Sequence, residues 1–241
     1  VPVHLFGQTA PVEELLPLAQ AHGAVIVEDA AQSQGATRHG RPAGGLGLAA
    51  GTSFYPGKNL GAAGDAGAVL TNDPEIAARV RTLSAHGSDR KYVHDLIGVN
   101  SRLDTIQAVV LLAKLKRLAR WNDLRREAAA RYTELLADVP GVQVPTVAPG
   151  NVDVWHLYVI RVEERDRVLD ELHAAGIGAG IHYPYPVHLT KAYAELGLGP
   201  GSFPVAEAAA GRILSLPLYP HITAEQQAQV VSVLASALRR P

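Results

Sequence analysis

The chain has no cysteine and no methionine in its 241 residues. Without cysteine it has neither a disulfide framework nor a thiolate metal site, which disfavours a small secreted domain and favours a cytoplasmic protein. Without methionine even the initiator residue is missing, and the sequence opens directly on Val1-Pro2-Val3-His4-Leu5, a strand-like pattern and not a targeting peptide. We therefore expect a further segment before Val1 in the natural protein.

The sequence also lacks an excess of either charge and lacks long apolar runs. Its formal net charge is -1 and its sequence pI is about 6.9. Binding to nucleic acid or to an anionic membrane surface depends on a basic excess, so we expect neither partner. The longest apolar stretch, around residues 106–118, is interrupted by Lys114, Lys116 and Arg117. A membrane-spanning helix would need roughly 18 apolar residues in a row.

The first half of the chain has the pattern of an α/β domain. Apolar positions at helical spacing over residues 12–19 end at Gly23, and the apolar run Ala24-Val25-Ile26-Val27 follows. A short β-branched run behind a helix predicts a parallel strand covered on both faces. Glu28 and Asp29 follow this strand, at the end where open α/β sheets bind ligands. We expect a mainly parallel sheet here.

Lys58 is predicted to lie on a turn between two strands. Residues 52–55 and 67–70 have strand patterns, and Pro56, Gly57 and Gly61 lie between them. Further on, Asp73-Pro74 predicts a helix start, and residues 86–100 form an irregular polar segment.

A long helix from Asp104 to Leu136 is expected to carry the domain boundary. Its interleaved basic and acidic residues indicate a solvated helix face. After the Pro/Gly-rich connector 140–149, the pattern predicts a strand at 155–162, a helix at 165–175, a strand at 176–181 and a helix at 224–238. We therefore predict a large domain at 1–124 and a smaller α/β domain at 125–241.

Three residues of the first half are candidates for chemistry. A poorly solvated lysine favours its neutral amine, which imine formation with an aldehyde requires, although a loop lysine such as Lys58 is commonly just exposed. Asp29 at the end of a buried strand could keep a pyridine nitrogen protonated, or it could cap a helix that starts at Ala30. Ser53 could donate to a phosphate or be structural.

Other chemistries have no support in the sequence. The interval from Gly51 to Gly57 is one residue too long for a Walker phosphate loop, and Asn59 follows Lys58 where that loop has serine or threonine. The third glycine of a dinucleotide fingerprint is missing after Gly45 and Gly47, and no G-x-S-x-G elbow occurs. The segment His182-Tyr-Pro-Tyr-Pro-Val-His188 cannot place two histidines on one helix face, so no metal site is predicted.

Taken together, several ordered motifs resemble the DegT/DnrJ/EryC1/StrS family of sugar aminotransferases. They are Glu28-Asp29-Ala30-Ala31-Gln32-Ser33, Ser53-Phe54-Tyr55-Pro56-Gly57-Lys58-Asn59-Leu60-Gly61 and Gly98-Val99-Asn100-Ser101-Arg102-Leu103-Asp104, with His4-Leu5-Phe6-Gly7-Gln8 before them and Ile181-His182-Tyr183-Pro184 after them. The resemblance covers essentially the whole chain. It implies a fold-type I transferase that depends on pyridoxal 5'-phosphate (PLP) and acts as a homodimer with shared active sites.

The resemblance assigns a role to each matching residue. It implies that Lys58 forms the Schiff base and shuttles the proton, that Asp29 pairs with the pyridine nitrogen, and that Gln32 contacts the ring region near its phenolic oxygen. Ser53 would hold the phosphate, and Asn100 would reach the phosphate of the neighbouring subunit's cofactor. His182 and Tyr183 would line the sugar site. The family's N-terminal segment, which supplies further cofactor contacts, is not in this sequence.

The implied reaction transfers an amino group from L-glutamate to a nucleotide-linked keto sugar. The form of the lysine motif most resembles members that aminate C3, often of a dTDP-3-keto-6-deoxyhexose used in antibiotic or surface glycans. The rival readings are a C4-aminating or UDP-sugar enzyme of the same family, and a non-catalytic member with a regulatory or dimerisation role. Sugar dehydratases of the family have histidine in place of the lysine, so Lys58 argues against that class.

Overall fold

The structure is a computed structural model that describes residues 1–239, and it divides into two compact units. The first unit contains residues 1–123 and 147–156, and the second contains residues 124–146 and the chain from 157 onward. The first boundary lies beside the predicted one at residue 124. Residues 147–156, however, lie in the first unit, whereas the sequence placed them in the smaller domain.

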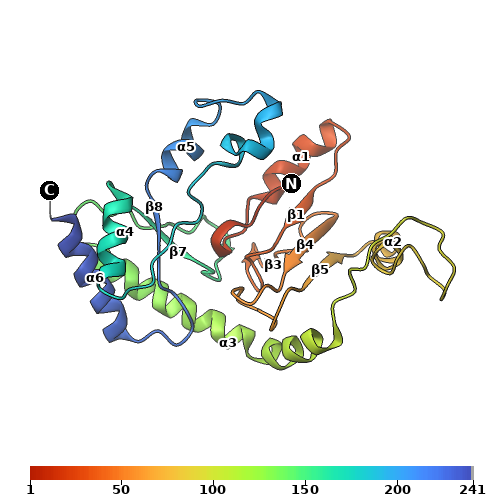
Figure 1. Ribbon diagram of the computed structural model, residues 1–241, viewed down its shortest axis with the longest axis horizontal. Helices are drawn as coiled ribbons and strands as arrows, with labels where there is room; N and C mark the ends of the chain where they lie inside the picture. Colours follow the sequence, from red (N-terminus) through yellow and green to blue (C-terminus); the bar gives the residue numbers. More distant parts are fainter. Residues whose placement is uncertain (240–241) are drawn as a thin grey trace. The chain divides into compact units, whose positions relative to one another are not determined.

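The first unit is a mixed α/β structure built around a short sheet (Figure 1). Its elements in chain order are η1 (Leu5–Gly7), α1 (Val12–Ala21), β1 (Val27–Asp29), β2 (Thr37–Arg38), β3 (Arg41–Pro42), β4 (Ala49–Ser53), β5 (Gly67–Thr71), α2 (Pro74–Ser84), the first part of α3 (Thr105–Leu136) and β6 (Asn151–Val152). Val1 to Leu5, expected as a strand, contributes a single bridge from Val3 to Asp29.

The main sheet has the strand order β1-β4-β5. Strand β1 pairs with β4 in parallel, and β4 pairs with β5 antiparallel. The prediction of a mainly parallel sheet is therefore wrong for the part of the chain that the structure describes. The reason lies in the connection, because residues 54–66 join β4 to β5 without the crossover helix that a parallel pair requires.

One face of the predicted apolar run is covered and the other is not. Ile26 is buried in a cluster with Val12 of α1 and with Leu46. Val25 is 65% exposed, and Val27 is also exposed. In the described structure α1 thus covers one face of this run, and the prediction that both faces are covered is wrong.

Glu28 holds the glycine-containing loop after β3 against the sheet. The side chain is fully buried, and its oxygens accept four hydrogen bonds of 2.7–2.8 Å, from the His4 ring and from the backbone N–H groups of Gly44, Leu46 and Gly47. The other ring nitrogen of His4, Nδ1, accepts from a backbone N–H, which leaves Nε2 as the donor to Glu28. Burial raises the pKa of Glu28, but the four hydrogen bonds outweigh burial and bring this pKa to about 2.

Strand β6 explains why residues 147–156 belong to the first unit. It pairs with β2 in antiparallel register, Arg38 opposite Asn151. The buried Arg38 also donates to the carbonyl of Pro149 and to Asn151 Oδ1, at 3.0 and 3.1 Å. The sequence of this connector, which is rich in proline and glycine, did not indicate the pairing. Its partners in β2 lie more than a hundred residues upstream.

The helices on either side of the irregular segment 86–100 agree with prediction. Asp73 Oδ1 accepts from the N–H groups of Glu75 and Ile76 and caps α2 at its proline-containing first turn. Helix α3 runs over 32 residues from Thr105 to Leu136, and the boundary between the units falls within it as predicted.

The second unit is a small α/β structure. Besides the end of α3, it contains β7 (Tyr158–Arg161), α4 (Arg165–Ala174), η2 (Val187–Leu189), η3 (Lys191–Leu196), α5 (Pro204–Ala210), β8 (Ile213–Leu216) and α6 (Ala224–Leu238). Strands β7 and β8 are antiparallel, and α4 packs against α6. The predicted helices at 165–175 and 224–238 are confirmed. The predicted strand at 176–181 is reduced to one bridge, from Gly180 to Ser215.

Two features are absent from residues 1–239. No helix there combines the length and the apolar character that crossing a membrane would need. No cluster of histidine and carboxylate side chains in that range could hold a metal ion.

Candidate functional site

Lys58 lies on a turn at the end of β4, as predicted. Strand β4 ends at Ser53 and β5 begins at Gly67. The turn is closed by hydrogen bonds from Lys58 N–H to the Tyr55 carbonyl, 2.8 Å, and from Ala62 N–H to the Phe54 carbonyl, 2.7 Å. The backbone of Lys58 is therefore held at a fixed place beyond the sheet.

The Lys58 amine is only partly solvated. Burial lowers the pKa of Lys58, and the negative charge of Asp29 acts in the opposite direction. A lower pKa increases the fraction of neutral amine at a given pH, and the neutral amine is the nucleophile. The structure thus brings Lys58 and Asp29 into electrostatic range of each other.

Asp29 occupies the last position of β1. It lies opposite Gly51 in the parallel pairing with β4, so its side chain and that of Ser53 belong to the carboxyl ends of neighbouring strands. Asp29 Oδ1 accepts from the N–H of Ala31 at 3.0 Å, within a turn. The alternative that Asp29 caps a helix starting at Ala30 is wrong, because a turn follows β1 and the chain then enters β2.

Gln32 and Ser53 are held by short local contacts. Gln32 is buried, and its Oε1 accepts from the N–H of Phe6 at 2.6 Å. Ser53 Oγ accepts from the N–H of Tyr55 at 3.2 Å, which leaves the hydroxyl proton of Ser53 for donation to another acceptor. Gln34 Nε2 donates to the Ser53 carbonyl at 2.8 Å and fixes the end of β4.

Asn100 lies elsewhere in the first unit, between α2 and α3. Its Oδ1 accepts from Arg102 Nε at 2.9 Å, so its amide hydrogens are on the opposite side of the group. It lines a cleft of about 760 Å³ with residues of β5 and α2 and with the segment just before α3. Lys58, Asp29 and Ser53 are not among the described residues that line this cleft. One chain therefore does not bring Asn100 together with the Lys58 group.

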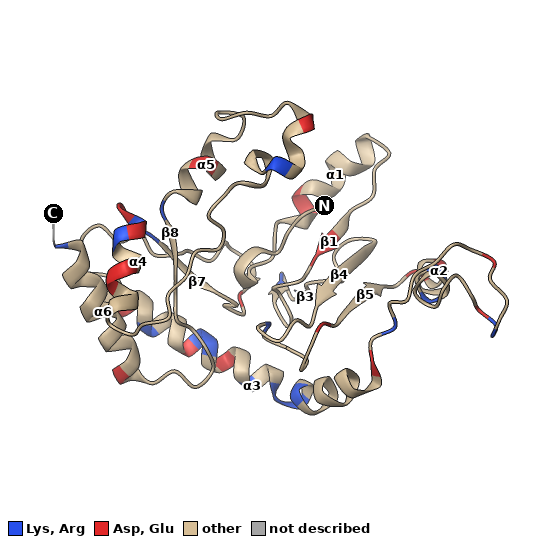
Figure 2. Ribbon diagram, in the orientation of Figure 1, with Lys and Arg blue, Asp and Glu red and all other residues tan. Residues whose placement is uncertain are grey.

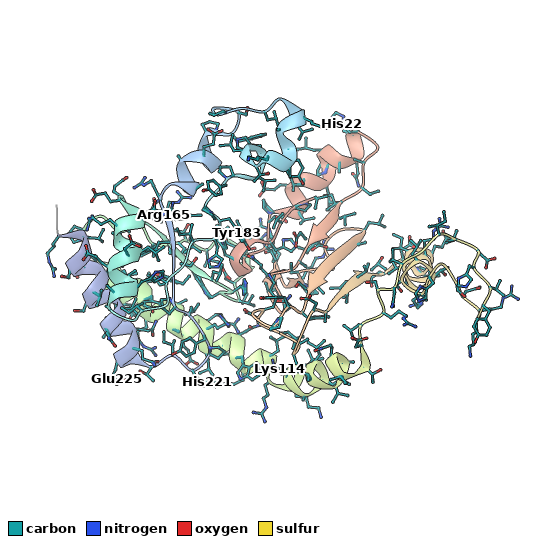
Figure 3. The ribbon with its side chains drawn as sticks, in the orientation of Figure 1. His22, Lys114, Arg165, Tyr183, His221 and Glu225 are labelled. Atoms are coloured by element: carbon teal, nitrogen blue, oxygen red, sulfur yellow. The ribbon has the colours of Figure 1, made fainter. Side chains whose placement is uncertain are left out.

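His182 and Tyr183 belong to the second unit. His182 Nδ1 is 2.8 Å from Ser215 Oγ on β8, which fixes the orientation of the ring. Tyr183, labelled in Figure 3, stacks edge-on against His182 and has about half of its surface exposed.

Asn59 is a residue of the site that the sequence reading did not single out. It is buried directly after Lys58, and its Nδ2 donates to Asn122 Oδ1 at 3.0 Å and to the Val154 carbonyl at 2.9 Å. Its Oδ1 is 3.2 Å from Nδ1 of His156. These partners lie far away in the sequence, and no spacing rule connects them to the lysine motif.

A second anchor of the turn comes from α3. Lys114, labelled on that helix in Figure 3, donates from Nζ to the Gly61 carbonyl at 2.7 Å. The turn that carries Lys58 is thus held by side chains from α3 and from residues 154–156, in addition to its own backbone bonds.

Gly61 is required in this turn by close backbone packing. A Cβ at Gly61 would lie 2.3 Å from the Pro56 carbonyl oxygen, which is backbone and cannot move away cheaply. We expect Gly61→Ala to destabilise the protein by about 1–3 kcal/mol. Gly57→Ala is the matched control, because its Cβ would meet only side-chain atoms of Tyr55 at 3.6 Å or more. Urea unfolding of both variants tests this, and equal stability would contradict the packing argument.

The donor set around Lys58 fits a phosphorylated pyridine aldehyde. A partly desolvated amine lies within electrostatic range of a carboxylate at the end of β1, as a Schiff-base lysine and a partner for a pyridinium nitrogen require. A hydroxyl with a proton to donate stands at the end of the neighbouring strand. Asn59 and Lys114 keep the backbone of this set in place.

Comparison with known proteins shows one family to which this chain is similar over most of its length. The sequence model of the DegT/DnrJ/EryC1/StrS aminotransferase family matches residues 1–235. The chain is 50% identical over 234 residues to the erythromycin biosynthesis sensory transduction protein EryC1 of Saccharopolyspora erythraea, covering 97% of this chain and 64% of that protein. It is 48% identical to the dTDP-3-amino-3,4,6-trideoxy-alpha-D-glucose transaminase of Streptomyces venezuelae, covering 97% of this chain and 62% of that enzyme.

A solved structure agrees with these matches. The crystal structure of S. venezuelae DesV in complex with a ketimine intermediate has a TM-score of 0.94 and 47% sequence identity to this chain. It covers 99% of this chain and 64% of DesV. The fold of the described residues is thus that of a DegT-family aminotransferase, and the chain spans a little under two thirds of the length of these relatives.

Proposed function

Because the chain belongs to the DegT/DnrJ/EryC1/StrS aminotransferase family, we propose that the full-length protein is a PLP-dependent nucleotide-sugar aminotransferase. It transfers an amino group from L-glutamate to a keto sugar, at C3 of a dTDP-3-keto-6-deoxyhexose. The observation that carries this proposal is a partly desolvated Lys58 within electrostatic range of Asp29, beyond the carboxyl ends of β1 and β4.

The roles proposed for the residues are those that the family resemblance implies. PLP, when bound, supplies an electron sink for the carbanion that forms when the substrate loses a proton. Lys58 would hold the cofactor through Nζ and would carry the proton that the substrate carbon loses. Asp29 keeps the pyridine nitrogen protonated by its negative charge. Gln32, whose Oε1 accepts from the N–H of Phe6, would contact the ring, and Ser53 would donate its hydroxyl proton to the phosphate.

The choice of acceptor rests on relatives. The S. venezuelae enzyme is named for a dTDP-3-amino sugar, which supports dTDP and C3 over a C4-aminating or UDP-sugar reaction. EryC1 is named a sensory transduction protein, which favours the non-catalytic alternative. Lys58 and Asp29, which a purely regulatory protein would not need, are both present. His182 and Tyr183 are the residues proposed for the sugar side.

Borohydride reduction of the full-length protein after loading with PLP tests the proposal. We expect a reduced adduct on Lys58 by mass spectrometry and, before reduction, loss of the visible absorbance when L-glutamate is added. A panel of dTDP- and UDP-linked 3-keto and 4-keto sugars then identifies the acceptor. Absence of the Lys58 adduct would remove the enzymatic function and leave the regulatory one.

We further propose that the protein acts as a homodimer through the first half of α3. Ile106, Val109 and Leu112 recur at a spacing of three residues, so they lie within about a third of the helix circumference, and all are exposed, Leu112 by 63%. Figure 2 shows these first turns of α3 without charge, in contrast to the turns that follow. An apolar stripe of this kind needs cover. A second copy of the chain supplies this cover. Asn100, which lies just before the stripe, would then reach the phosphate of the cofactor in the neighbouring subunit.

Leu112→Glu is expected to convert the dimer to a monomer, because it places a charge within the apolar stripe. Light scattering coupled to size exclusion measures the mass directly. Val205→Glu is the control, since Val205 is an exposed apolar residue on α5 and outside the stripe. A Leu112→Glu protein that remains a dimer would contradict this assignment of the interface.

A further inference from the structure

Asn59 uses its whole amide to attach the Lys58 turn to two distant segments. Both of its amide hydrogens are donated, one to Asn122 Oδ1 and one to the Val154 carbonyl, and its Oδ1 contacts the His156 ring. The residue is 6% exposed, so water does not replace these partners when one is lost. A loop residue on a solvent-facing turn would not need three such bonds.

The partners of Asn59 lie where the chain leaves the first unit. Asn122 is one residue before the last residue of the first unit's main segment, Asp123, and His156 is the last residue of the returning segment. Val154 lies two residues before that second exit. The Lys58 turn is therefore bonded to both segments through which the chain continues into the second unit.

The same network also holds the strand end before Lys58. Asn122 Nδ2 donates to the Gln34 carbonyl at 2.9 Å, and Gln34 Nε2 donates to the Ser53 carbonyl at 2.8 Å. Ser53 ends β4 and Asn59 follows Lys58, so both flanks of the lysine are fixed by one chain of side-chain hydrogen bonds. Its centre is Asn122 on α3.

We propose that Asn59 is a positioning residue for Lys58. It holds the turn next to Lys58 in place, because its side chain is hydrogen-bonded to α3 and to residues 154–156. In this way Asn59 sets how far the Lys58 amine is buried. This burial then depends on the positions of the two segments through which the chain continues into the second unit. The inference rests on the proposed role of Lys58 in the enzyme, but the geometry of Asn59 is independent of any bound molecule.

The solvation of Lys58 is the property that Asn59 should control. Burial is the main cause of the lowered pKa of Lys58, and Asp29 is the charged group that opposes it. If the turn is released, the amine gains water and its charged form becomes more stable. The titration of Lys58 therefore reports the position of the turn, whereas the titration of an exposed lysine does not.

The test is competitive acetylation of the full-length protein without PLP, followed by mass spectrometry of each lysine peptide across a pH series. In Asn59→Ala we expect the labelling curve of Lys58 to shift to higher pH, and that of the exposed Lys116 to stay in place. Asn72→Ala, at an exposed asparagine between β5 and α2, is the matched control and should leave both curves unchanged.

An unchanged Lys58 curve in a folded Asn59→Ala protein would overturn the proposal and leave Asn59 as a merely structural residue. If Asn59→Ala does not fold, Asn122→Ala removes only one of the three contacts of Asn59, and it should shift the Lys58 curve in the same direction. A Lys58 curve that stays in place there would also overturn it. Because PLP is left out, failure of the cofactor to attach to Lys58 is a separate result that concerns the proposed function alone.

Discussion

Replacement of Lys58 by alanine should lower the rate of amino transfer by more than about 1000-fold in the full-length enzyme, since one side chain is both nucleophile and proton carrier. Binding of PLP should weaken but persist, because Asp29 and Ser53 remain. The measurement is the rate of L-glutamate-dependent product formation, followed together with the visible absorbance of the bound cofactor.

Lys58→Arg is the matched control for charge. It keeps a cation opposite Asp29 but has no amine of low enough pKa to attack an aldehyde. We expect the same loss of rate as in Lys58→Ala, with better retention of the fold and of cofactor binding. Activity within tenfold of the natural protein in either variant would mean that another lysine carries the reaction.

Truncation of Glu28 to alanine is expected to destabilise the protein by more than about 3 kcal/mol, because each buried donor left without an acceptor costs about 1–3 kcal/mol. The change leaves the N–H groups of Gly44, Leu46 and Gly47 and the His4 ring without their acceptor. Urea unfolding measures the loss. Glu75→Ala, at an exposed glutamate on α2, is the control and should change stability little. Equal effects of the two substitutions would contradict the role given to Glu28.

The same carboxylate makes stability depend on pH in acid. Glu28 has a pKa of about 2 in the folded protein against 4.5 as its ordinary value, so folding is favoured wherever the carboxylate is charged. Its contribution, about 3 kcal/mol, is complete above pH 4.5 and is lost as the pH falls through 2. Glu28→Gln should lack this part of the slope between pH 5 and pH 2. If the free energy of unfolding of Glu28→Gln fell with pH as steeply as that of the natural protein, other groups would be responsible for the acid sensitivity.

Local rules predicted those parts of the molecule that depend on neighbours in the sequence. The cap of α2 by Asp73, the extent of α3, the final helix 224–238 and the turn that carries Lys58 all follow from residues a few positions apart. The position of Asp29 at a strand end beside β4 was also predictable, because a buried apolar run ended there.

The rest depends on contacts that no local pattern records. The antiparallel direction of β5 results from the absence of a crossover helix between β4 and β5. Val25 is exposed because α1 covers only the opposite face of this run. Asn59 and Glu28 look like ordinary polar neighbours of more conspicuous residues. Their importance appears only when the partners of each, at Asn122 and at Gly47, are seen beside them.

The return of β6 to the first unit has a consequence for recombination between related genes. A single crossover near residue 124 would exchange the second unit together with β6, and would pair a foreign strand with β2 and its buried Arg38. A chimaera that preserves this ladder needs junctions on both sides of residues 147–156. The second unit can therefore be transplanted only as two separate gene fragments, joined around an unaltered ten-residue insert.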